Sequence, residues 1–128
     1  MRGLDTNVLV RFLLKDDQVQ AKAAEEAIAS GEPIRVSLLT ILETEWVLRS
    51  AAGLDKHTII RTFKALLETR ELEFESEAIL EQALYDFENF AADFADCLML
   101  ATYRATGCSA MLTFDAKAAR LPGATLLS

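Results

Sequence analysis

The sequence has few of the side chains that build zinc and disulfide sites. Its 128 residues contain one histidine, His57, and two cysteines, Cys97 and Cys108. The cysteines stand eleven positions apart, and no histidine or further cysteine lies at metal-ligand spacing from them, which excludes a zinc site. Two isolated cysteines are most simply reduced thiols, so we expect a cytoplasmic protein. We expect His57 to lie exposed at the start of a helix.

Long apolar runs and an excess of positive charge are also missing. No run approaches the roughly 18 apolar residues of a membrane span, and the early charges of Arg2, Asp5 and Arg11 leave no room for a secretory signal. The net charge of −7 argues against a general nucleic-acid binder but does not exclude a nuclease. Basic residues near the two ends could form a rim against phosphate or merely aid solubility: Arg2, Arg11, Lys15, Lys117 and Arg120.

The remaining composition, 52% hydrophobic and 26% charged, is that of a globular chain, and its length predicts one domain over residues 1–128. Apolar periodicity and turn residues predict helices at 6–14, 19–31, 38–52, 59–67, 79–87 and 93–106. Short strands are predicted at 1–5, 33–37, 72–75, 110–114 and 124–127. This alternation indicates an α/β protein with a parallel sheet covered by helices on both faces.

Four acidic residues stand inside or just beyond apolar segments, where an ionised group is costly unless it is paired or binds a metal. They are Asp5, Glu43, Asp96 and Asp115. Asp5 and Asp115 follow predicted strands, and ligands of such folds bind at the carboxyl ends of strands. Brought together, the four would form an all-oxygen pocket for a hard divalent cation. Taken singly, each could also be an ordinary cap or turn residue.

Helix geometry separates Glu43 from its neighbour Glu45, because residues two apart point about 200° apart around a helix. Glu45 has Arg49 four positions later, so we expect an exposed ion pair there. Glu43 shares a mostly inward row with Thr40 and Val47. Glu43 is therefore the better candidate for a metal ligand.

Asp93 and Asp96 are three positions apart and share one face of the last long helix. Asp93 is well placed as the N-cap, with Asp96 in the first turn. Asp93 either supports a metal site from the outer shell or is a cap and nothing more, and the sequence leaves both roles open.

The motifs together resemble the PIN domain family, and within it the VapC-type toxin ribonucleases of type II toxin–antitoxin systems. The resemblance covers nearly the whole chain and rests on the order and spacing of motifs that are not specific singly. These are Asp5-Thr6-Asn7, Ser37-x-x-Thr40-x-x-Glu43, Asp93-Phe94-Ala95-Asp96-Cys97-Leu98 and Thr113-Phe114-Asp115. The family usually has a small residue where this chain has Cys97, which we interpret as a tolerated packing variant. The implied fold is a PIN-like three-layer α/β/α sandwich with a short parallel sheet of four or five strands.

The resemblance implies a metal-dependent endoribonuclease that hydrolyses RNA with a metal-activated water, leaving a 5′-phosphate and a 3′-hydroxyl. Mg²⁺ or Mn²⁺ would be held by the catalytic acids Asp5, Glu43, Asp96 and Asp115. Hydrogen-bonding neighbours would orient the carboxylates or the water: Thr6, Asn7 and Thr113. The implied partners are an RNA substrate, a small VapB-like antitoxin and a second copy of the chain in a homodimer, with no membrane.

Other functions remain open to different degrees. A response-regulator phosphoacceptor domain needs paired acids after its first strand, and here Asp5 stands alone there. A PIN nuclease with a non-toxin role in RNA processing, a catalytically silent PIN scaffold and a DNA-directed nuclease are all compatible with the sequence. The sequence does not identify the RNA or the number of metal ions.

Overall fold

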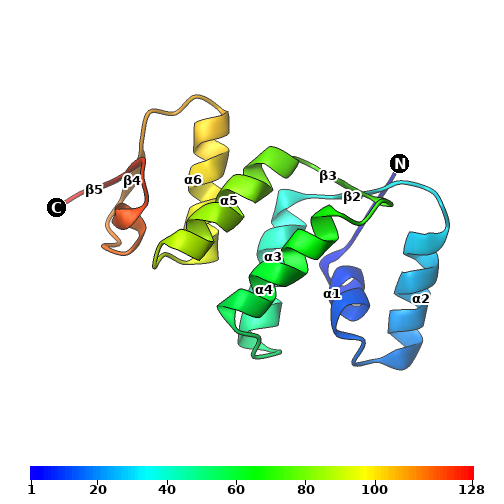
Figure 1. Cartoon of the computed structure of the whole chain (residues 1–128). Helices are drawn as coiled ribbons and strands as arrows, with labels where there is room; N and C mark the ends of the chain where they lie inside the picture. The colour runs from blue at the N-terminus through cyan, green and yellow to red at the C-terminus, as the bar shows by residue number, and fades with distance from the viewer. The chain divides into compact units, whose positions relative to one another are not determined.

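Strands and helices alternate along all 128 residues of the computed structural model, as Figure 1 shows. The chain falls into two units, Met1–Ser76, here called unit 1, and Glu77–Ser128, here called unit 2. The four candidate acids divide evenly between them, with Asp5 and Glu43 in unit 1 and Asp96 and Asp115 in unit 2.

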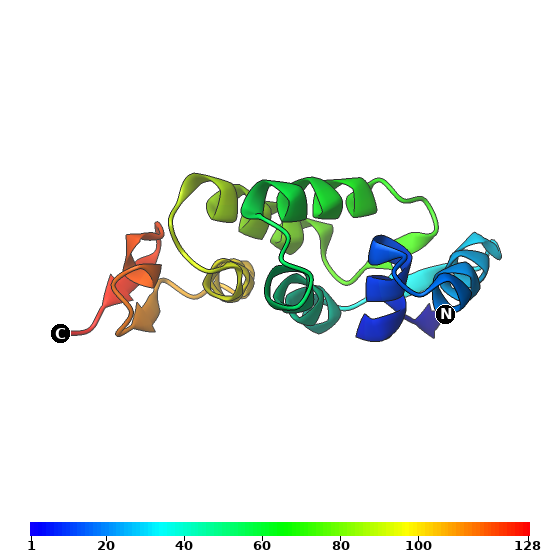
Figure 2. The same ribbon diagram turned by 90° about the horizontal axis from the view of Figure 1, so that it is seen from below.

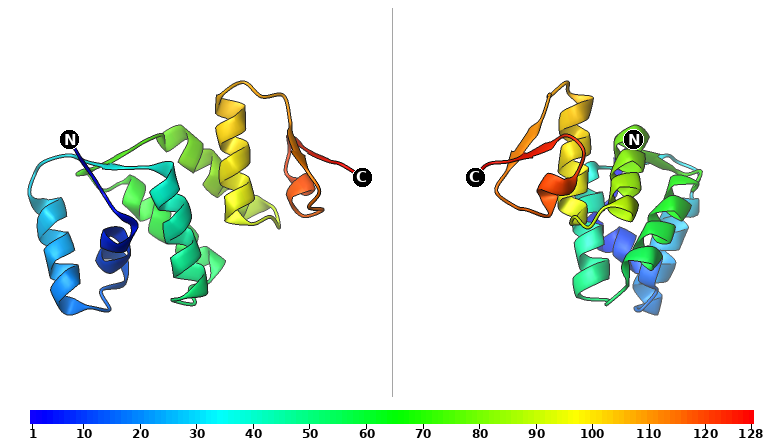
Figure 3. Two further views of the ribbon diagram at one scale, coloured as in Figure 1. Left: turned by 180° about the vertical axis from the view of Figure 1, so that it is seen from behind. Right: turned by 60° about the vertical axis from the view of Figure 1, so that its left-hand side comes forward.

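Unit 1 is built around three short parallel strands. They run in the order β1 (Arg2–Gly3), β2 (Ile34–Val36) and β3 (Leu72–Phe74), and Ile34 is in register with both Arg2 and Leu72. Parallel neighbours need long crossover connections, and each crossover here is a helix pair. These pairs are α1 (Thr6–Leu14) with α2 (Gln18–Ala29), and α3 (Leu38–Ser50) with α4 (Lys56–Leu67). Figure 3 shows both pairs extending below the strands in its left-hand view.

Capping side chains set where the helices of unit 1 begin. Each cap accepts a hydrogen bond from a backbone N–H of the first turn, which has no partner within the helix. The caps are Asp5 for α1, Asp17 for α2, Ser37 for α3 and Asp55 for α4. At the other end of α3, Gly53 adopts the left-handed conformation with φ of 68°, which an L side chain would strain.

The core of unit 1 follows from helical periodicity. In α4 every third or fourth residue is apolar and buried, and this face contacts α3 and β3: Ile59, Ile60, Phe63 and Leu66. From α3, Ile41 and Leu48 are fully buried. This packing fixes the position of α3, which carries Glu43.

Unit 2 contains α5 (Glu77–Asn89), α6 (Phe94–Ala105), β4 (Met111–Thr113), the short 3₁₀ helix η1 (Ala118–Arg120) and β5 (Ala124–Leu126). Figures 1 and 2 show α5 crossing α6, and Phe87 meets Phe94 edge-to-face with ring centroids 5.5 Å apart. β4 and β5 pair in parallel, with Met111 opposite Ala124. The right-hand view of Figure 3 shows η1 in the connection between them.

An ion pair with a buried carboxylate, which the sequence did not predict, joins the two helices of unit 2. The Asp86 carboxylate on α5 is almost fully buried, and Arg104 Nη1 on α6 lies 3.4 Å from its Oδ2 atom. Gln82 Nε2 donates to the other carboxylate oxygen at 3.3 Å. This buried charge therefore keeps two hydrogen-bond partners, as buried charges require.

The α/β class and the parallel pairing of short strands are confirmed. The five strands form a group of three and a group of two. Stacking of one continuous sheet into three layers stays a prediction. His57 is exposed near the start of α4 as expected, and neither Cys97 nor Cys108 forms a disulfide.

Candidate functional site

In unit 1, the first acid follows directly from the end of the sheet. The Leu4 N–H donates to the Arg35 carbonyl oxygen at 3.0 Å, which continues the pairing of β1 with β2 by one residue. Asp5 comes next, exposed, and caps α1 by accepting from the Asn7 backbone N–H at 3.3 Å. The strand end and the helix start together hold Asp5 at the sheet edge, as its position after a strand predicted.

The second acid is tied to the same point by side chains of α3. The Thr40 hydroxyl donates to the Leu4 carbonyl oxygen at 3.3 Å, which connects the first turn of α3 to the residue before Asp5. One turn further along α3, Glu43 Oε1 accepts a hydrogen bond of 2.8 Å from the Thr6 hydroxyl. Glu43 is thereby held beside the start of α1.

The facing of α3 differs from the prediction. Glu45 is only 2% exposed and accepts from Arg49 Nε at 2.9 Å, so the ion pair exists but its carboxylate is buried. Glu43, predicted in an inward row, is exposed. Both predictions were wrong because α3 carries apolar residues on nearly all sides, and its sequence pattern cannot define the inward face.

In unit 2, two further acids stand at the start of α6. Asp93 occupies the N-cap position, and its carbonyl oxygen accepts from the Asp96 and Cys97 N–H groups at 3.1 Å each. The Asp93 side chain makes no capping hydrogen bond. Asp93 is thus a cap by position only.

The fourth acid follows β4 in a turn that fixes its backbone and side chain. The Asp115 N–H donates to the Thr113 hydroxyl at 3.0 Å, and the Lys117 N–H donates to Asp115 Oδ1 at 2.8 Å. Thr113 therefore orients the backbone of Asp115, whereas Thr6 orients a carboxylate directly.

Three of the four carboxylates share one pattern of hydrogen bonding. Asp5, Glu43 and Asp115 each accept a hydrogen bond at one oxygen from a single donor, and the other oxygen has no protein donor. Asp96 accepts no hydrogen bond from the protein at either oxygen. Hydrogen bonds therefore orient Asp5, Glu43 and Asp115, and all four carboxylates keep at least one oxygen available for an outside ligand.

The acids of unit 2 influence one another through their charges. The pKa of Asp96 is raised from its ordinary value of 3.8, first by burial and then by the charges of Asp115 and Asp93. The start of α6 and the end of β4 therefore form one local concentration of negative charge, which a cation would stabilise. Neither unit by itself gathers three carboxylate, thiol or imidazole side chains around one point in metal-ligand geometry.

The two ends of the predicted basic rim differ in structure. In unit 1 each basic residue is already in an ion pair: Arg2 with Glu32, Arg11 with Asp16, and Lys15 with Glu25. In unit 2 neither Lys117 nor Arg120 forms an ion pair, and both are exposed. Of the five rim residues, only the two at the Asp115 end are without an ion pair within their own unit.

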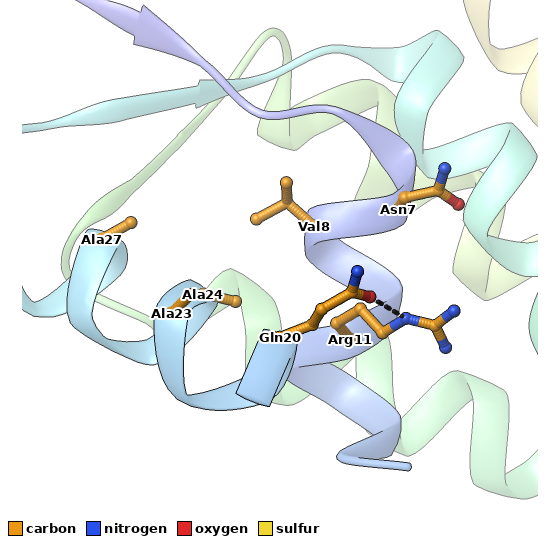
Figure 4. Close-up of a pocket in the computed structure, with 7 residues that line it drawn as sticks. All are labelled: Asn7, Val8, Arg11, Gln20, Ala23, Ala24 and Ala27. Atoms are coloured by element: carbon orange, nitrogen blue, oxygen red, sulfur yellow. Dashed lines mark hydrogen bonds between the residues drawn. The ribbon is translucent and has the colours of Figure 1, made fainter. Parts of the chain in front are cut away.

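A groove between α1 and α2 has a volume of about 320 Å³. Figure 4 shows its small apolar floor and its polar mouth, where Arg11 Nε donates to Gln20 Oε1 at 2.7 Å. Asn7 lines the groove, but none of the four acids does. The candidate site is therefore distinct from the groove.

A family model of the PIN domain matches residues 4–124, a stretch that includes all four acids. The chain belongs to the PIN domain family. This PIN domain also has similar solved structures. One is described as a toxin–antitoxin complex from Klebsiella pneumoniae, with 23% identity, a TM-score of 0.38 and coverage of 98% of this chain and 96% of that chain.

A second solved structure is a sarcin–ricin loop cleaving VapC toxin of Mycobacterium tuberculosis. It is 16% identical with a TM-score of 0.45, and the match covers 94% of each chain. Comparison with curated protein sequences gives no match. No helix of this PIN domain combines the length and apolar character needed to cross a bilayer.

Proposed function

We propose that this PIN domain is a metal-dependent endoribonuclease and the toxin of a cytoplasmic toxin–antitoxin pair. The observation that carries the proposal is the set of aimed carboxylates within the stretch matched to the PIN family, residues 4–124. The catalytic residues and metal ligands are proposed to be Asp5, Glu43, Asp96 and Asp115. The toxin role rests on the resemblance of the sequence motifs to VapC-type ribonucleases.

The donor set fits Mg²⁺ or Mn²⁺, because it offers carboxylate oxygens only, which hard divalent cations prefer. Asp96 and Asp115 repel one another in the protein alone, and a cation between like charges removes that repulsion. When bound, the cation would lower the pKa of water to supply a nucleophile at neutral pH and would neutralise charge on the phosphate.

The side chains of this chain have separate roles in the proposal. Thr6 holds one oxygen of Glu43 and leaves the other free, and the Asn7 N–H does the same for Asp5. Thr113 and the Lys117 N–H fix the turn that presents Asp115. Asp93, without a capping hydrogen bond, adds negative charge beside Asp96 from the outer shell.

Metal dependence is the direct test of the proposal. Purified protein should cleave RNA with Mg²⁺ or Mn²⁺, lose activity in EDTA and regain it when Mn²⁺ is restored. A matched DNA strand in the same assay separates a ribonuclease from a DNA-directed enzyme. Full activity after exhaustive chelation would contradict the metal mechanism, and no cleavage under any metal would leave a silent PIN scaffold.

The toxin role has its own test in cells. Expression of the chain should arrest growth, expression of the Asp5→Asn variant should not, and co-expression of a small antitoxin encoded beside the gene should restore growth. Harmless expression of protein that is nuclease-active after purification would remove the toxin role and leave an RNA-processing nuclease.

The proposal also covers the domain organisation and the oligomeric state of the protein. We treat residues 1–128 as one PIN domain that pairs with a second copy in a homodimer. Light scattering at micromolar concentration measures the dimer directly, and a monomer across that range would contradict it. Cooperative unfolding in a single transition is expected if the chain is one domain.

A further inference from the structure

Ser37 and Thr40 belong to the motif that leads to Glu43, but neither is a proposed metal ligand. Their hydroxyls form a directed chain at the start of α3. The Ser37 hydroxyl donates to Thr40 Oγ1 at 3.0 Å, and the Thr40 hydroxyl donates to the Leu4 carbonyl oxygen at 3.3 Å. Ser37 Oγ also accepts from the Thr40 backbone N–H at 3.0 Å, which caps the helix. The chain therefore ends on the residue that precedes Asp5.

Leu4 is held from two sides at the end of β1. Its N–H donates to the Arg35 carbonyl oxygen of β2 at 3.0 Å. In a continuing parallel ladder, the next N–H along β2 would donate to the Leu4 carbonyl oxygen. β2 ends at Val36 and the chain turns into α3, so the Thr40 hydroxyl supplies a donor for this carbonyl oxygen. A side chain of α3 thereby takes the place of a strand as the partner of Leu4.

The start of α3 is also fixed from the other edge of the sheet. Glu75 follows β3, and its N–H donates to the Val36 carbonyl oxygen at 2.9 Å. Glu75 Oε1 accepts at 2.9 Å from the N–H of Leu38, the first residue of α3. A carboxylate is favoured at this place, because the first N–H groups of a helix have no partner within the helix. The start of α3 is thus connected to the ends of all three strands of unit 1.

We propose that Thr40 is a positioning residue that sets Asp5 against Glu43. Asp5 directly follows Leu4 in the chain, and Glu43 lies about one turn after Thr40 on α3. The hydrogen bond from Thr40 to Leu4 therefore joins the two segments that carry these acids. The inference rests on the proposed metal-dependent nuclease, and it adds a residue that controls metal affinity without contacting the metal.

Thr40 and Thr6 restrain the two acids in different ways. Thr6 acts on the Glu43 carboxylate itself, at 2.8 Å, whereas Thr40 acts on the backbone beside Asp5. The Thr6 hydrogen bond orients one side chain, and the Thr40 hydrogen bond limits how far α3 can shift along the strand end. Two carboxylates bind a cation more tightly when their separation is already set, because binding then requires less ordering.

Thr44 offers a matched comparison one turn further along α3. Its side chain is fully buried, and its hydroxyl has no hydrogen-bond partner within unit 1. Thr40→Val and Thr44→Val therefore make the same chemical change on the same helix, and only the first removes a hydrogen bond. Thr40→Ser keeps the hydroxyl and removes only the methyl group.

Mn²⁺ binding without RNA measures the role of Thr40. Full-length protein is titrated with Mn²⁺, and the electron paramagnetic resonance signal of the free ion gives the Kd. We expect Thr40→Val to weaken binding about tenfold, the lower end of the usual loss for a residue that supports a metal ligand. Thr40→Ser should restore most of the affinity, and Thr44→Val should leave the Kd unchanged. An equal loss in both valine variants would overturn the inference, because it would reflect packing of α3 alone.

Ser37→Ala is a second, milder variant should Thr40→Val fail to fold, which circular dichroism detects. Thr40 then keeps its hydroxyl and loses the neighbour that orients it. Mn²⁺ binding should weaken by less than in Thr40→Val. Asp55→Ala removes the cap of another helix, α4, and controls for a general loss of stability. An unchanged Kd for Ser37→Ala and Thr40→Val, or an equal loss for Asp55→Ala, would overturn the inference.

Amide hydrogen exchange in EDTA tests the same contact without metal. The exchange rate of the Leu4 N–H, measured by NMR, reports how firmly the end of β1 is held. We expect Thr40→Val to raise this rate roughly fivefold, the equivalent of one typical net hydrogen bond. Thr44→Val should leave the rate unchanged, and Asp55→Ala should raise it less than Thr40→Val does. Equal rates in wild-type and Thr40→Val proteins would overturn the inference.

The outcomes separate this inference from the proposed function. Wild-type protein that binds Mn²⁺ and cleaves RNA, with an unaltered Kd for Thr40→Val, would overturn the inference and leave the nuclease intact. Wild-type protein that binds no Mn²⁺ and cleaves no RNA would remove the proposed function, and the Leu4 exchange rates would still decide whether Thr40 holds the segment before Asp5. Faster exchange with an unaltered Kd would limit Thr40 to supporting the strand end, and the inference would be wrong.

Discussion

The two pairs of candidate acids are held in different ways. In unit 1, Glu43 accepts a hydrogen bond from the Thr6 hydroxyl and Asp5 accepts one from the Asn7 N–H. In unit 2, Asp96 has no hydrogen-bond donor and faces the charges of Asp115 and Asp93. Unit 1 thus gives each of its two acids one hydrogen-bond donor, whereas in unit 2 Asp115 has a donor in the Lys117 N–H and Asp96 has none.

This difference separates two requirements of a carboxylate site. Donors restrict the orientation of a carboxylate, which makes its free oxygen available in one direction. Uncompensated like charges cost stability in the protein alone but are the groups that gain most from a cation. We therefore expect changes in unit 1 to act mainly through geometry and changes in unit 2 to act mainly through charge.

The largest expected effect is the loss of an acid from either pair. Asp5→Asn, Glu43→Gln, Asp96→Asn and Asp115→Asn should each lower the cleavage rate by more than about 100-fold, beyond the usual loss from an outer-shell change. Glu26→Gln and Glu81→Gln remove one exposed acid from each unit and serve as controls with unchanged rates. If one of the four variants stays active, its residue is not part of the site. The two pairs of acids would then contribute unequally to catalysis.

The next effect concerns the donor of unit 1. Thr6→Val should reduce activity about 10- to 100-fold, because Glu43 loses the hydroxyl that orients it, and Thr6→Ser should retain most activity. The measurement is the Mn²⁺ concentration at half-maximal rate, which should rise for the valine variant. An equal loss in the serine variant would mean that packing of the methyl group matters and not the hydrogen bond.

Two ion pairs with a buried carboxylate allow a comparison of stability. Arg104→Met leaves the Asp86 carboxylate, 2% exposed, with Gln82 alone, and Arg49→Met leaves the equally buried Glu45 without its donor. Each variant should lose about 1–3 kcal/mol in the free energy of unfolding, the cost of an unsatisfied buried group. Urea denaturation measures this loss. The Asp86→Asn, Arg104→Met double variant should recover part of it, and no recovery would show that the pair is not coupled.

The smallest expected effect is on the pH dependence of stability. Because the folded pKa of Asp96 is raised, the folded state holds this proton to higher pH than the unfolded state does. Stability from this group is therefore lost as pH rises from the ordinary value of 3.8 through the folded pKa. Asp96→Asn should make the metal-free protein slightly more stable at neutral pH, with the difference closing in acid.

Thermal unfolding in EDTA at a series of pH values measures the effect of Asp96→Asn. A neutral-pH destabilisation by Asp96→Asn would contradict the charge-based description of unit 2.

The sequence predicted the elements more closely than the contacts. The helix predicted at 6–14 is observed at the same residues, because Asp5 is a strong cap and the apolar spacing inside it is regular. Positions after strands correctly placed Asp5 and Asp115 at strand ends. The facing of α3 was wrong, because Glu43 and Glu45 lie on a helix whose apolar residues surround its axis.

The sequence pattern could not predict contacts between residues that are far apart in the chain. Thr6 and Glu43 are 37 positions apart, and Asp86 and Arg104 are 18 apart. Local propensity acts within a few residues, so no spacing rule could pair them. The sequence pattern also could not show which residues of the predicted basic rim form ion pairs. In the structure Arg2, Arg11 and Lys15 each pair with an acidic residue, whereas Lys117 and Arg120 do not.

The sequence by itself determined the alternation of strands and helices, the caps, and the order of four acids that identifies a PIN domain. These depend on short-range backbone preferences and on residue types that the chain carries wherever it folds. Only the tertiary structure decided that Glu43 is held by Thr6, that Glu45 is buried, and that Thr40 bonds the residue before Asp5. Burial and pairing are properties of the packed neighbours, and those neighbours come from distant parts of the chain.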